Sequence, residues 1–364
     1  MMSNLELQVT LWPSFPHFEK FAFDDRISAI RLNSAQMELV EIDRELEIID
    51  RLNPTVPLFY DVKGRQLRVD SIDGDNTQYL DLTLNHPISV NTPTPVLFKA
   101  GSDYAKLLDV IDGGYRLIFD GGPDFAVRRG ESLHIRDKSL RSWGPQFTEA
   151  ELEKIDKVKK FGFKRYFLSY VQSKADVDEF VNLVGSEAEV YLKIEDQKGL
   201  QYVANEFVKT PNLKLVAARG DLYVEVDKPH EALAAQKLII EKDPEALVGS
   251  RILLSVIQNP YKELRELLCI YQQQGLSEIE VQQILLSLVK PTVPDCVDFS
   301  ELAWLYDIGY KKMLICDEIC LNEGLLDSAI NAFEAFKKSY AAPALLTPTT
   351  SSRSLRSLLT KKRS

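Results

Sequence analysis

Eight short apolar runs, separated along most of the chain by stretches with helical spacing, constrain the fold more than any other feature. The runs lie at 6–11, 27–32, 57–62, 164–170, 188–194, 213–218, 251–257 and 311–316. Most of them lack polar alternation, which is typical of parallel strands that are covered on both faces. Eight such strands with intervening helices predict an α/β fold of the (β/α)8 TIM-barrel type rather than an open doubly wound sheet.

Amphipathic stretches occupy most of the intervals between these runs. We expect helices at 35–51, 148–160, 174–184, 198–208, 229–242, 259–272, 276–289, 299–307 and 323–338. The segment 35–51 places apolar side chains at helical spacing, and the sequence Thr148-Glu-Ala-Glu151 is typical of a helix N-terminus.

Residues 69–147 interrupt this alternation. They are rich in Gly, Asp, Pro and β-forming residues, with recurrent turn signals and one short predicted helix near 103–109. This pattern predicts a small all-β domain inserted after the third strand. The barrel itself would then consist of residues 1–68 and 148–340.

The charge and the termini exclude several classes of protein. The 364 residues carry a net charge of −10, which argues against nucleic-acid binding and against anionic membrane surfaces. The N-terminal sequence lacks the features of a signal peptide, and no apolar run is long enough to span a bilayer. The four cysteines cannot form a disulfide scaffold at this length, so we expect a cytoplasmic protein. Residues 341–364 form a basic, Ser/Thr-rich tail that we expect to be disordered.

Charged and polar residues follow several of the predicted strands. They are Arg31, Asn33, Asp61, Lys63, Arg68, Lys193, Glu195, Arg219 and Asp221. Strand C-termini and the loops after them build the active site of such barrels. Glu195 and Asp221, on neighbouring strands, would make a two-carboxylate site for a hard divalent cation, with positions open to substrate oxygens. Lys193 beside them would neutralise a transferring group or move a proton, although a salt-bridge network around the rim explains the same residues.

Four of these strand ends carry recognisable motifs in a fixed order. They are Ile30-Arg31-Leu32-Asn33, Asp61-Val62-Lys63-Gly64 with Arg68, Lys193-Ile194-Glu195, and Arg219-Gly220-Asp221-Leu222. Here the chain resembles the pyruvate kinase family, whose A-R-[LM]-N, D-T-K-G, K-I-E and A-R-G-D-L motifs follow the same order. The resemblance implies a phosphoenolpyruvate/pyruvate-type barrel with that family's inserted B domain.

The resemblance also implies roles for individual residues. Glu195 and Asp221 would bind Mg²⁺ (or Mn²⁺), which holds the substrate, and Lys193 would stabilise the phosphoryl group in flight. Arg31 would contact the phosphate, and Arg68 would act at the mouth facing the inserted domain. Substrate-binding positions would include Gly220, Asn33, Asp61 and Lys63. The implied partners are small molecules of the phosphoenolpyruvate/pyruvate class, with ADP or ATP.

Other positions depart from the family pattern. Ala35 and Val62 replace two potassium ligands, which argues against activation by K⁺. Tyr223 replaces a glycine beside the metal site, and Val256 stands where the family has a strand-seven threonine. Residues 258–290 are extra, and no match to the family's C-terminal regulatory domain follows, so we expect a monomer or homodimer.

Three functions are compatible with these features. The first is Mg²⁺-dependent phosphoryl transfer between phosphoenolpyruvate, or a related enol phosphate, and a nucleotide. The second is a metal-dependent aldolase or lyase that handles a pyruvate enolate, which suits the loss of the strand-seven threonine. The third is a non-catalytic protein that uses the barrel for binding.

Overall fold

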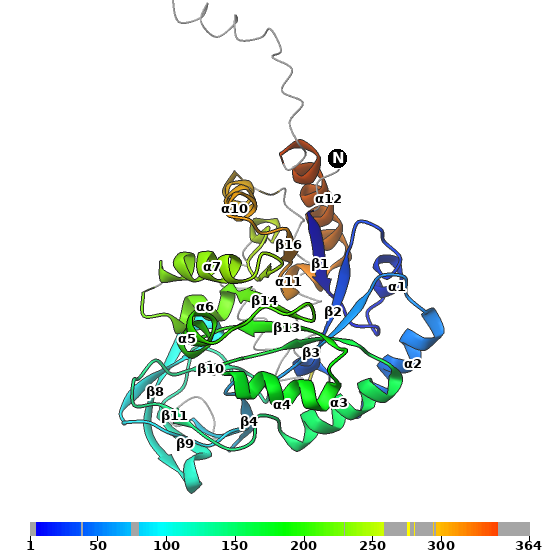
Figure 1. The fold of residues 1–364 in the computed structure, drawn as a ribbon. Helices are drawn as coiled ribbons and strands as arrows, with labels where there is room; N and C mark the ends of the chain where they lie inside the picture. Colours follow the sequence, from blue (N-terminus) through cyan, green and yellow to red (C-terminus); the bar gives the residue numbers. More distant parts are fainter. Residues whose placement is uncertain are drawn as a thin grey trace, which may run out of the picture.

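Eight parallel strands close into a barrel in the computed structural model (Figure 1). The structure describes residues 5–37, 39–73, 80–228, 230–257, 275–276, 280, 294 and 296–340. The barrel strands are β1 (Glu6–Thr10), β2 (Ala29–Asn33), β3 (Leu58–Val62), β12 (Arg165–Leu168), β13 (Glu189–Ile194), β14 (Leu213–Ala218), β15 (Leu247–Gly249) and β16 (Lys312–Leu314). Their order around the barrel follows the chain, and β16 pairs with β1 to close it. The predicted (β/α)8 barrel is confirmed.

Helices surround these strands. They are α1 (Phe18–Phe21), α2 (Ile42–Leu52), α3 (Glu149–Phe161), α4 (Lys174–Val184), α5 (Gln197–Asn205), α6 (Arg219–Glu225), α7 (Glu231–Lys242), α10 (Cys296–Asp307), α11 (Asp317–Cys320) and α12 (Glu323–Ser339). The helix predicted at 35–51 begins later, at Ile42, after the 3₁₀ turn η1 (Ser34–Gln36). The helices predicted at 259–272 and 276–289, and the tail, lie outside the described residues.

Residues between β3 and α3 form a separate β domain. Its strands are β4 (Val69–Ile72), β5 (Asp81–Leu84), β6 (Ile88–Ser89), β7 (Thr94–Phe98), β8 (Asp103–Ile111), β9 (Arg116–Asp120), β10 (Leu133–His134) and β11 (Arg141–Ser142), with the 3₁₀ turns η2 (Lys99–Gly101) and η3 (Asp112–Gly114). Six of them form an antiparallel sheet in the order β10-β7-β8-β9-β5-β4, and β11 pairs with β6. The short helix predicted near 103–109 is wrong: these residues belong to β8, which pairs with β7 and β9.

Strand seven also differs from its prediction. The run 251–257 is not a strand, because β15 ends at Gly249 and the run contains the 3₁₀ turn η4 (Leu254–Val256) instead. Ser250, Arg251 and Leu253 have φ of 71°, 61° and 55°, in the left-handed region that interrupts an extended chain. Ile252, Leu253 and Val256 of this run serve as core residues without belonging to the sheet, whereas Leu254 is 37% exposed.

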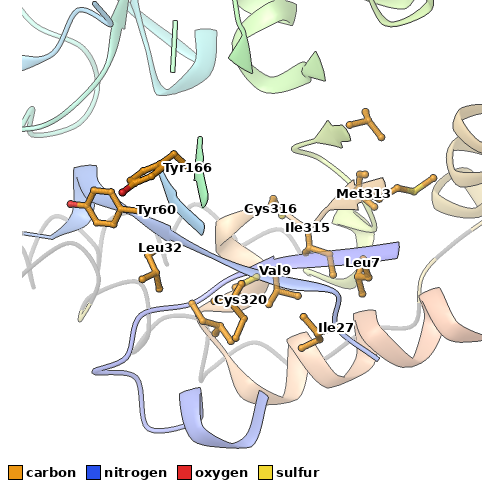
Figure 2. Packing of buried hydrophobic residues seen from close by; sticks show 14 of the residues in the cluster. Leu7, Val9, Ile27, Leu32, Tyr60, Tyr166, Met313, Ile315, Cys316 and Cys320 are labelled. Carbon is orange, nitrogen blue, oxygen red and sulfur yellow. The ribbon is translucent and has the colours of Figure 1, made fainter. Parts of the chain in front are cut away.

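Alternation along the strands builds two apolar layers. Leu7, Val9, Leu32, Tyr60 and Tyr166 point outward and pack under the helices (Figure 2). On each strand, the residues next to these outward positions point into the barrel. They form the apolar floor of the barrel, which consists of Ala29, Phe59, Phe167, Tyr191, Val216, Leu247 and Leu314. Because side chains on a strand alternate with a period of two, the next inward positions lie one layer nearer the C-terminal mouth.

Candidate active site

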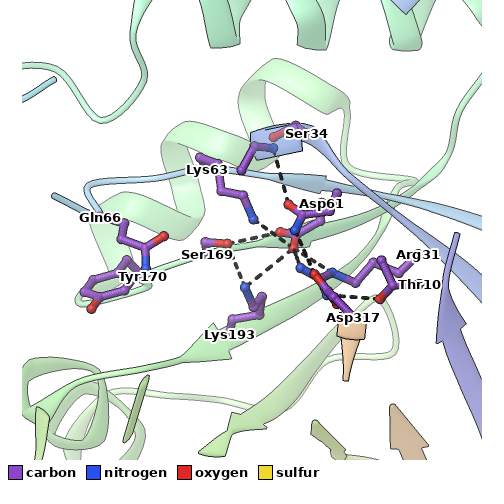
Figure 3. A network of polar contacts seen from close by, with 12 residues as sticks. Thr10, Arg31, Ser34, Asp61, Lys63, Gln66, Ser169, Tyr170, Lys193 and Asp317 are labelled. Carbon is purple, nitrogen blue, oxygen red and sulfur yellow. Dashed lines mark hydrogen bonds and ion pairs between the residues drawn. The ribbon is translucent and has the colours of Figure 1, made fainter. Parts of the chain in front are cut away.

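The layer above this apolar floor is polar. Arg31, Asp61, Ser169 and Lys193 each follow an inward floor residue of their own strand by two positions, and all four are buried or nearly so. The parallel strands therefore bring side chains that are far apart in sequence into one network at the barrel mouth (Figure 3). The same alternation of side chains along each strand that forms the apolar floor therefore also positions these polar and charged side chains.

Asp61 is the centre of the network and is fully buried. Its Oδ2 atom lies 2.7 Å from the Arg31 guanidinium, 3.0 Å from Lys63 Nζ and 3.5 Å from Lys193 Nζ. The Ser169 hydroxyl donates to Oδ1 at 3.0 Å and accepts from Lys193 Nζ at 2.9 Å. Burial alone would raise the pKa of Asp61, but the charges of Lys193, Lys63 and Arg31 hold it well below its usual range.

Lys193 and Glu195 lie on the same side of β13 and form an ion pair of 2.8 Å. The second carboxylate oxygen of Glu195 accepts the backbone N–H of Tyr170 at 2.6 Å. Burial raises the pKa of Glu195, and the nearby charge of Asp221 raises it further against the opposing effect of Lys193. The two carboxylates therefore repel each other across the site, as ligands of a shared cation do before it binds.

Asp317 is a site residue that the sequence analysis missed. It begins α11, after β16, and its carboxylate lies 2.8 Å from the Arg31 guanidinium and accepts from the Asn33 amide at 3.1 Å. The Arg31 guanidinium thus bridges Asp61 and Asp317 and also donates to the Thr10 hydroxyl at 3.1 Å. The signal in the sequence that could have identified Asp317 is its position as an acidic residue directly after the last predicted strand, 311–316.

Asp221 lies in the first turn of α6 and faces the inserted domain. His134, at the end of β10, approaches it with Nε2 at 3.6 Å from Oδ1. The other ring nitrogen, Nδ1, lies 2.5 Å from a carboxylate oxygen of Glu225, which also accepts from the Tyr170 hydroxyl at 3.1 Å. Burial opposes a charge on His134, but Glu225 and Asp221 outweigh it and raise its pKa. His134 was not among the residues singled out from the sequence, so this contact was missed.

The remaining predicted positions surround this network. Arg68 points toward the inserted domain, where its guanidinium donates to the Gly130 carbonyl at 2.6 Å and to Gln66. It contacts none of the four residues of the polar layer directly. Its charge nevertheless adds a small contribution to lowering the pKa of Lys63, which burial lowers most.

The mouth near strand seven differs from the prediction. Because β15 ends at Gly249, the residue at its C-terminal end is Ser250, and the buried Val256 lies further along the chain. A Cβ atom on Gly220 would lie 3.5 Å from the Ser250 side chain, so these two residues adjoin. Tyr223 is 44% exposed, and its ring lies 5.3 Å from the Arg251 guanidinium. A hydroxyl is therefore present at this strand end.

The donor set fits a divalent cation that takes oxygen ligands. Mg²⁺ is usually held by one or two carboxylates, with substrate oxygens and water at the remaining positions. Glu195 and Asp221 provide such a pair, and a cation would relieve their mutual repulsion, which adds to the effect of burial in raising the pKa of Glu195. Within the described ranges, no three His, Cys, Asp or Glu side chains are arranged as a metal site. Glu195 and Asp221 alone would leave positions on such an ion open to substrate oxygens and water.

Comparison with known proteins gives consistent results. Pyruvate kinase from Thermoplasma acidophilum is 26% identical over 263 residues, covering 68% of this chain and 47% of that protein. Pyruvate kinase from Methanocaldococcus jannaschii is 23% identical, covering 100% of this chain and 82% of that protein. The chain thus spans about half the length of the first relative and most of the second. No family model matches.

A solved structure shows the same fold. Pyruvate kinase from Cryptosporidium parvum superposes with a TM-score of 0.68 at 16% identity, covering 93% of this chain and 71% of that one. In the part of the chain that the structure describes, no helix has the length and apolar character to cross a membrane. The fold, the order of the strand-end motifs and the curated relatives agree, and the chain is a pyruvate-kinase-like protein.

Proposed function

We propose that the chain catalyses phosphoryl transfer between phosphoenolpyruvate, or a related enol phosphate, and a nucleotide. The observation that carries this proposal is the buried network around Asp61, with Arg31, Lys63 and Lys193 within 3.5 Å of one carboxylate. Buried ion pairs contribute little net stability compared with apolar packing. A cluster of this density at a barrel mouth therefore favours a binding role over a structural one.

The cations of the network suit a transferring phosphoryl group. Arg31 presents a planar guanidinium that matches phosphate oxygens, and Lys193 presents an ammonium as a point charge. Both are already oriented by Asp61, and Lys193 is also held by Ser169 and Glu195. Catalysis of phosphoryl transfer is mostly positioning and electrostatic stabilisation, which such a preorganised set provides.

Glu195 and Asp221 would hold a divalent cation between the network and the inserted domain. When bound, the ion would neutralise charge on the substrate's carboxylate and phosphate. The enolate left after transfer needs a proton, and Ser250 supplies a hydroxyl at the end of β15 that can hold a proton or a water. The inserted domain, which contacts α6 through His134 and Arg136, would keep bulk water from the mouth.

Calorimetry with oxalate, a mimic of the pyruvate enolate, tests this proposal. Mg²⁺ and oxalate should bind together to the full chain, and Glu195→Gln should abolish the binding. Glu189→Gln is the matched control, because Glu189 lies at the other end of the same strand and pairs with Lys214. Loss of oxalate binding in both variants would point to misfolding, and a shift in circular dichroism would show it.

Turnover assays then separate the three functions. Phosphoenolpyruvate with ADP should give pyruvate, at a rate that falls at least a hundredfold in Lys193→Met. Cleavage of aldol adducts of pyruvate without nucleotide turnover would instead assign a lyase. Absence of Mg²⁺ and oxalate binding by the wild type would overturn the proposal and leave a binding protein.

A further inference from the structure

The loop after β15 carries a guanidinium that the proposed function does not use. Three residues of this loop, Ser250, Arg251 and Leu253, have φ of 71°, 61° and 55°, although none of them is a glycine. Residues with side chains rarely adopt this left-handed conformation. Where they do, the surrounding structure has to hold them in place, and such positions are concentrated at functional sites.

Contacts on both sides of Arg251 hold the strained loop. The guanidinium of Arg219 donates to the Ser250 carbonyl oxygen at 3.1 and 2.7 Å, and Arg219 is itself paired with Glu301 at 2.6 Å. On the other side, Ile252 is fully buried in the core. Arg251 thus lies between two fixed neighbours, and its own side chain is exposed.

The ring of Tyr223 supports this exposed guanidinium. The ring centroid lies 5.3 Å from the guanidinium carbon of Arg251, which is within the range of a cation–π contact. Burial and the charge of Asp317 raise the pKa of Glu318, and the charge of Arg251 opposes them. Among the residues that the structure describes, however, no carboxylate forms an ion pair with Arg251. Its N–H donors therefore remain available to an anionic ligand.

Tyr223 and Arg251 adjoin the part of the site that would handle the enolate. Gly220 and Tyr223 are three positions apart in α6 and therefore lie on the same face of this helix. A Cβ atom on Gly220 would lie 3.5 Å from the Ser250 side chain, so the loop packs on this face. In the proposed function, Ser250 provides the hydroxyl for protonation of the enolate carbon, and Arg251 is the next residue. A substituent on that carbon would extend past Ser250 toward the guanidinium.

We propose that Arg251, supported by Tyr223, is a specificity-determining residue that selects an enolpyruvate-type substrate with a second carboxylate on its enol carbon substituent. A guanidinium matches a carboxylate because it offers two parallel N–H donors, and an aromatic ring below it fixes its plane. The inference rests on the proposed function, which places the enolate beside Ser250. It narrows the substrate class to enol phosphates that are larger and more acidic than phosphoenolpyruvate.

Two 2-oxo acids of the same shape test this selection by charge. 2-Oxoglutarate ends in a carboxylate where 5-methyl-2-oxohexanoate has two methyl groups, and oxalate has no substituent at all. Calorimetry of the full chain in the presence of Mg²⁺ gives the Kd of each ligand. The ratio of the first two Kd values measures recognition of the second carboxylate, and oxalate reports the rest of the site.

The wild type should bind 2-oxoglutarate at least tenfold more tightly than 5-methyl-2-oxohexanoate. Arg251→Gln removes the charge and should reduce this ratio below threefold, with oxalate affinity unchanged within about twofold. Tyr223→Phe keeps the ring and should preserve the ratio, whereas Tyr223→Ala should reduce it. Arg129→Gln is the matched control, because it removes an exposed guanidinium that pairs with Asp70 in the inserted domain. It should change neither the ratio nor the oxalate affinity.

The other outcomes overturn the inference. A ratio near one in the wild type would do so and, if oxalate binds, leave the proposed function standing. The same high ratio in wild type and Arg251→Gln would assign the selectivity to other cations of the mouth. Weaker ADP binding by Arg251→Gln at an unchanged ratio would assign the guanidinium to the nucleotide. Loss of oxalate binding in Arg251→Gln, but not in Arg129→Gln, would mean that Arg251 supports the whole site rather than the second carboxylate. Absence of oxalate binding by the wild type would overturn the proposed function and this inference together.

Discussion

The guanidinium of Arg31 lies 2.7 Å from the carboxylate of Asp61, at a position where the carboxylate is fully buried. Arg31 reaches Asp61 from the neighbouring strand, and Asn33 pairs with Asp61 in the register of β2 and β3. The pair is thus fixed by the sheet itself rather than by loops. This rigidity keeps the three cationic side chains of Arg31, Lys63 and Lys193 around one carboxylate.

Replacing the central carboxylate should destabilise the fold. Asp61→Asn keeps the size of the side chain but leaves Arg31, Lys63 and Lys193 without their shared counter-charge. We expect the free energy of unfolding to fall by about 3–5 kcal/mol, the usual cost of breaking a buried ion pair. Urea denaturation of the full chain measures it. Asp81→Asn, which removes a surface pair with Arg116, should leave the urea midpoint unchanged. Equal effects of the two substitutions would contradict a special role for Asp61.

The three cationic side chains around Asp61 predict that the activity of the protein does not depend on K⁺. Oδ2 of Asp61 already contacts three cationic side chains, and Ala35 and Val62 contribute no side-chain oxygen. A monovalent cation would have to displace a lysine or arginine and gain few ligands. Turnover of phosphoenolpyruvate and ADP should therefore differ less than about twofold between K⁺ and tetramethylammonium salts of equal ionic strength. Stimulation by K⁺ of tenfold or more would contradict this prediction. Oxalate calorimetry in the two salts gives a second reading that does not depend on turnover.

Continuous apolar runs made much of the fold predictable, and the side-chain period of two along each strand made part of the site predictable. Seven of the eight predicted barrel strands overlap observed ones, because each is an apolar run of five residues or so between polar segments. The same period placed Lys193 and Glu195 on one side of β13, where the structure has them. Charges at strand ends were visible because parallel strands of a barrel end at one mouth.

The assignment of strands from apolar runs was wrong for strand seven. The run 251–257 is more apolar than Leu247–Gly249, but it packs as core after the strand has ended. Hydrophobicity therefore selected the wrong segment, and the strand-end residue was sought at Val256 instead of Ser250. The segment 103–109 failed for a different reason. Tyr104, Leu107 and Leu108 lie at helical spacing over this short stretch, whereas in β8 the buried side chains are the alternating Ala105 and Leu107.

Contacts between residues that lie far apart in the chain could not be predicted from the sequence alone. Asp317 pairs with Arg31 across 286 positions, and His134 joins the inserted domain to Glu225 across 91. Neither pairing leaves a local pattern, because the residues have no fixed spacing. They follow from barrel closure and from the placement of the inserted sheet, which local spacing does not encode.

Gly64 should be intolerant of any side chain. A Cβ atom at this position would lie 2.4 Å from the backbone carbonyl oxygen of Ser169, which no side-chain rotation relieves. Gly64→Ala would push the backbone that presents Ser169 to Asp61. We expect a loss of about 1–3 kcal/mol in the free energy of unfolding, together with weaker binding of Mg²⁺ and oxalate.

Gly249→Ala is the control for this substitution, since the atoms nearest to a Cβ there belong to the side chains of Leu314 and Leu247, at ordinary contact distances of 3.5 Å and more. Its urea midpoint should lie closer to that of the wild type. The steric argument fails if Gly64→Ala is as stable as Gly249→Ala and still binds oxalate normally.

His17 should make the stability of the barrel depend on pH. Its ring packs among Phe15 and Phe21, and Nε2 donates to the Cys320 carbonyl at 2.9 Å, because a carbonyl only accepts. Burial lowers the pKa of His17 below its usual value. As the pH falls below about 6.5, the unfolded chain takes up a proton that the folded chain resists, so the free energy of unfolding decreases.

Comparison with His17→Phe isolates this contribution from those of other groups. The difference in free energy of unfolding between wild type and variant should be constant above about pH 7.5. Below about pH 6.5 it should shift against the wild type by up to about 1.4 kcal/mol per pH unit, until the folded histidine also becomes charged. Phe180→Leu, a buried change that removes no titratable group, should show a difference from wild type that is independent of pH. A pH-independent difference for His17→Phe as well would mean that the folded chain protonates His17 as readily as the unfolded chain does.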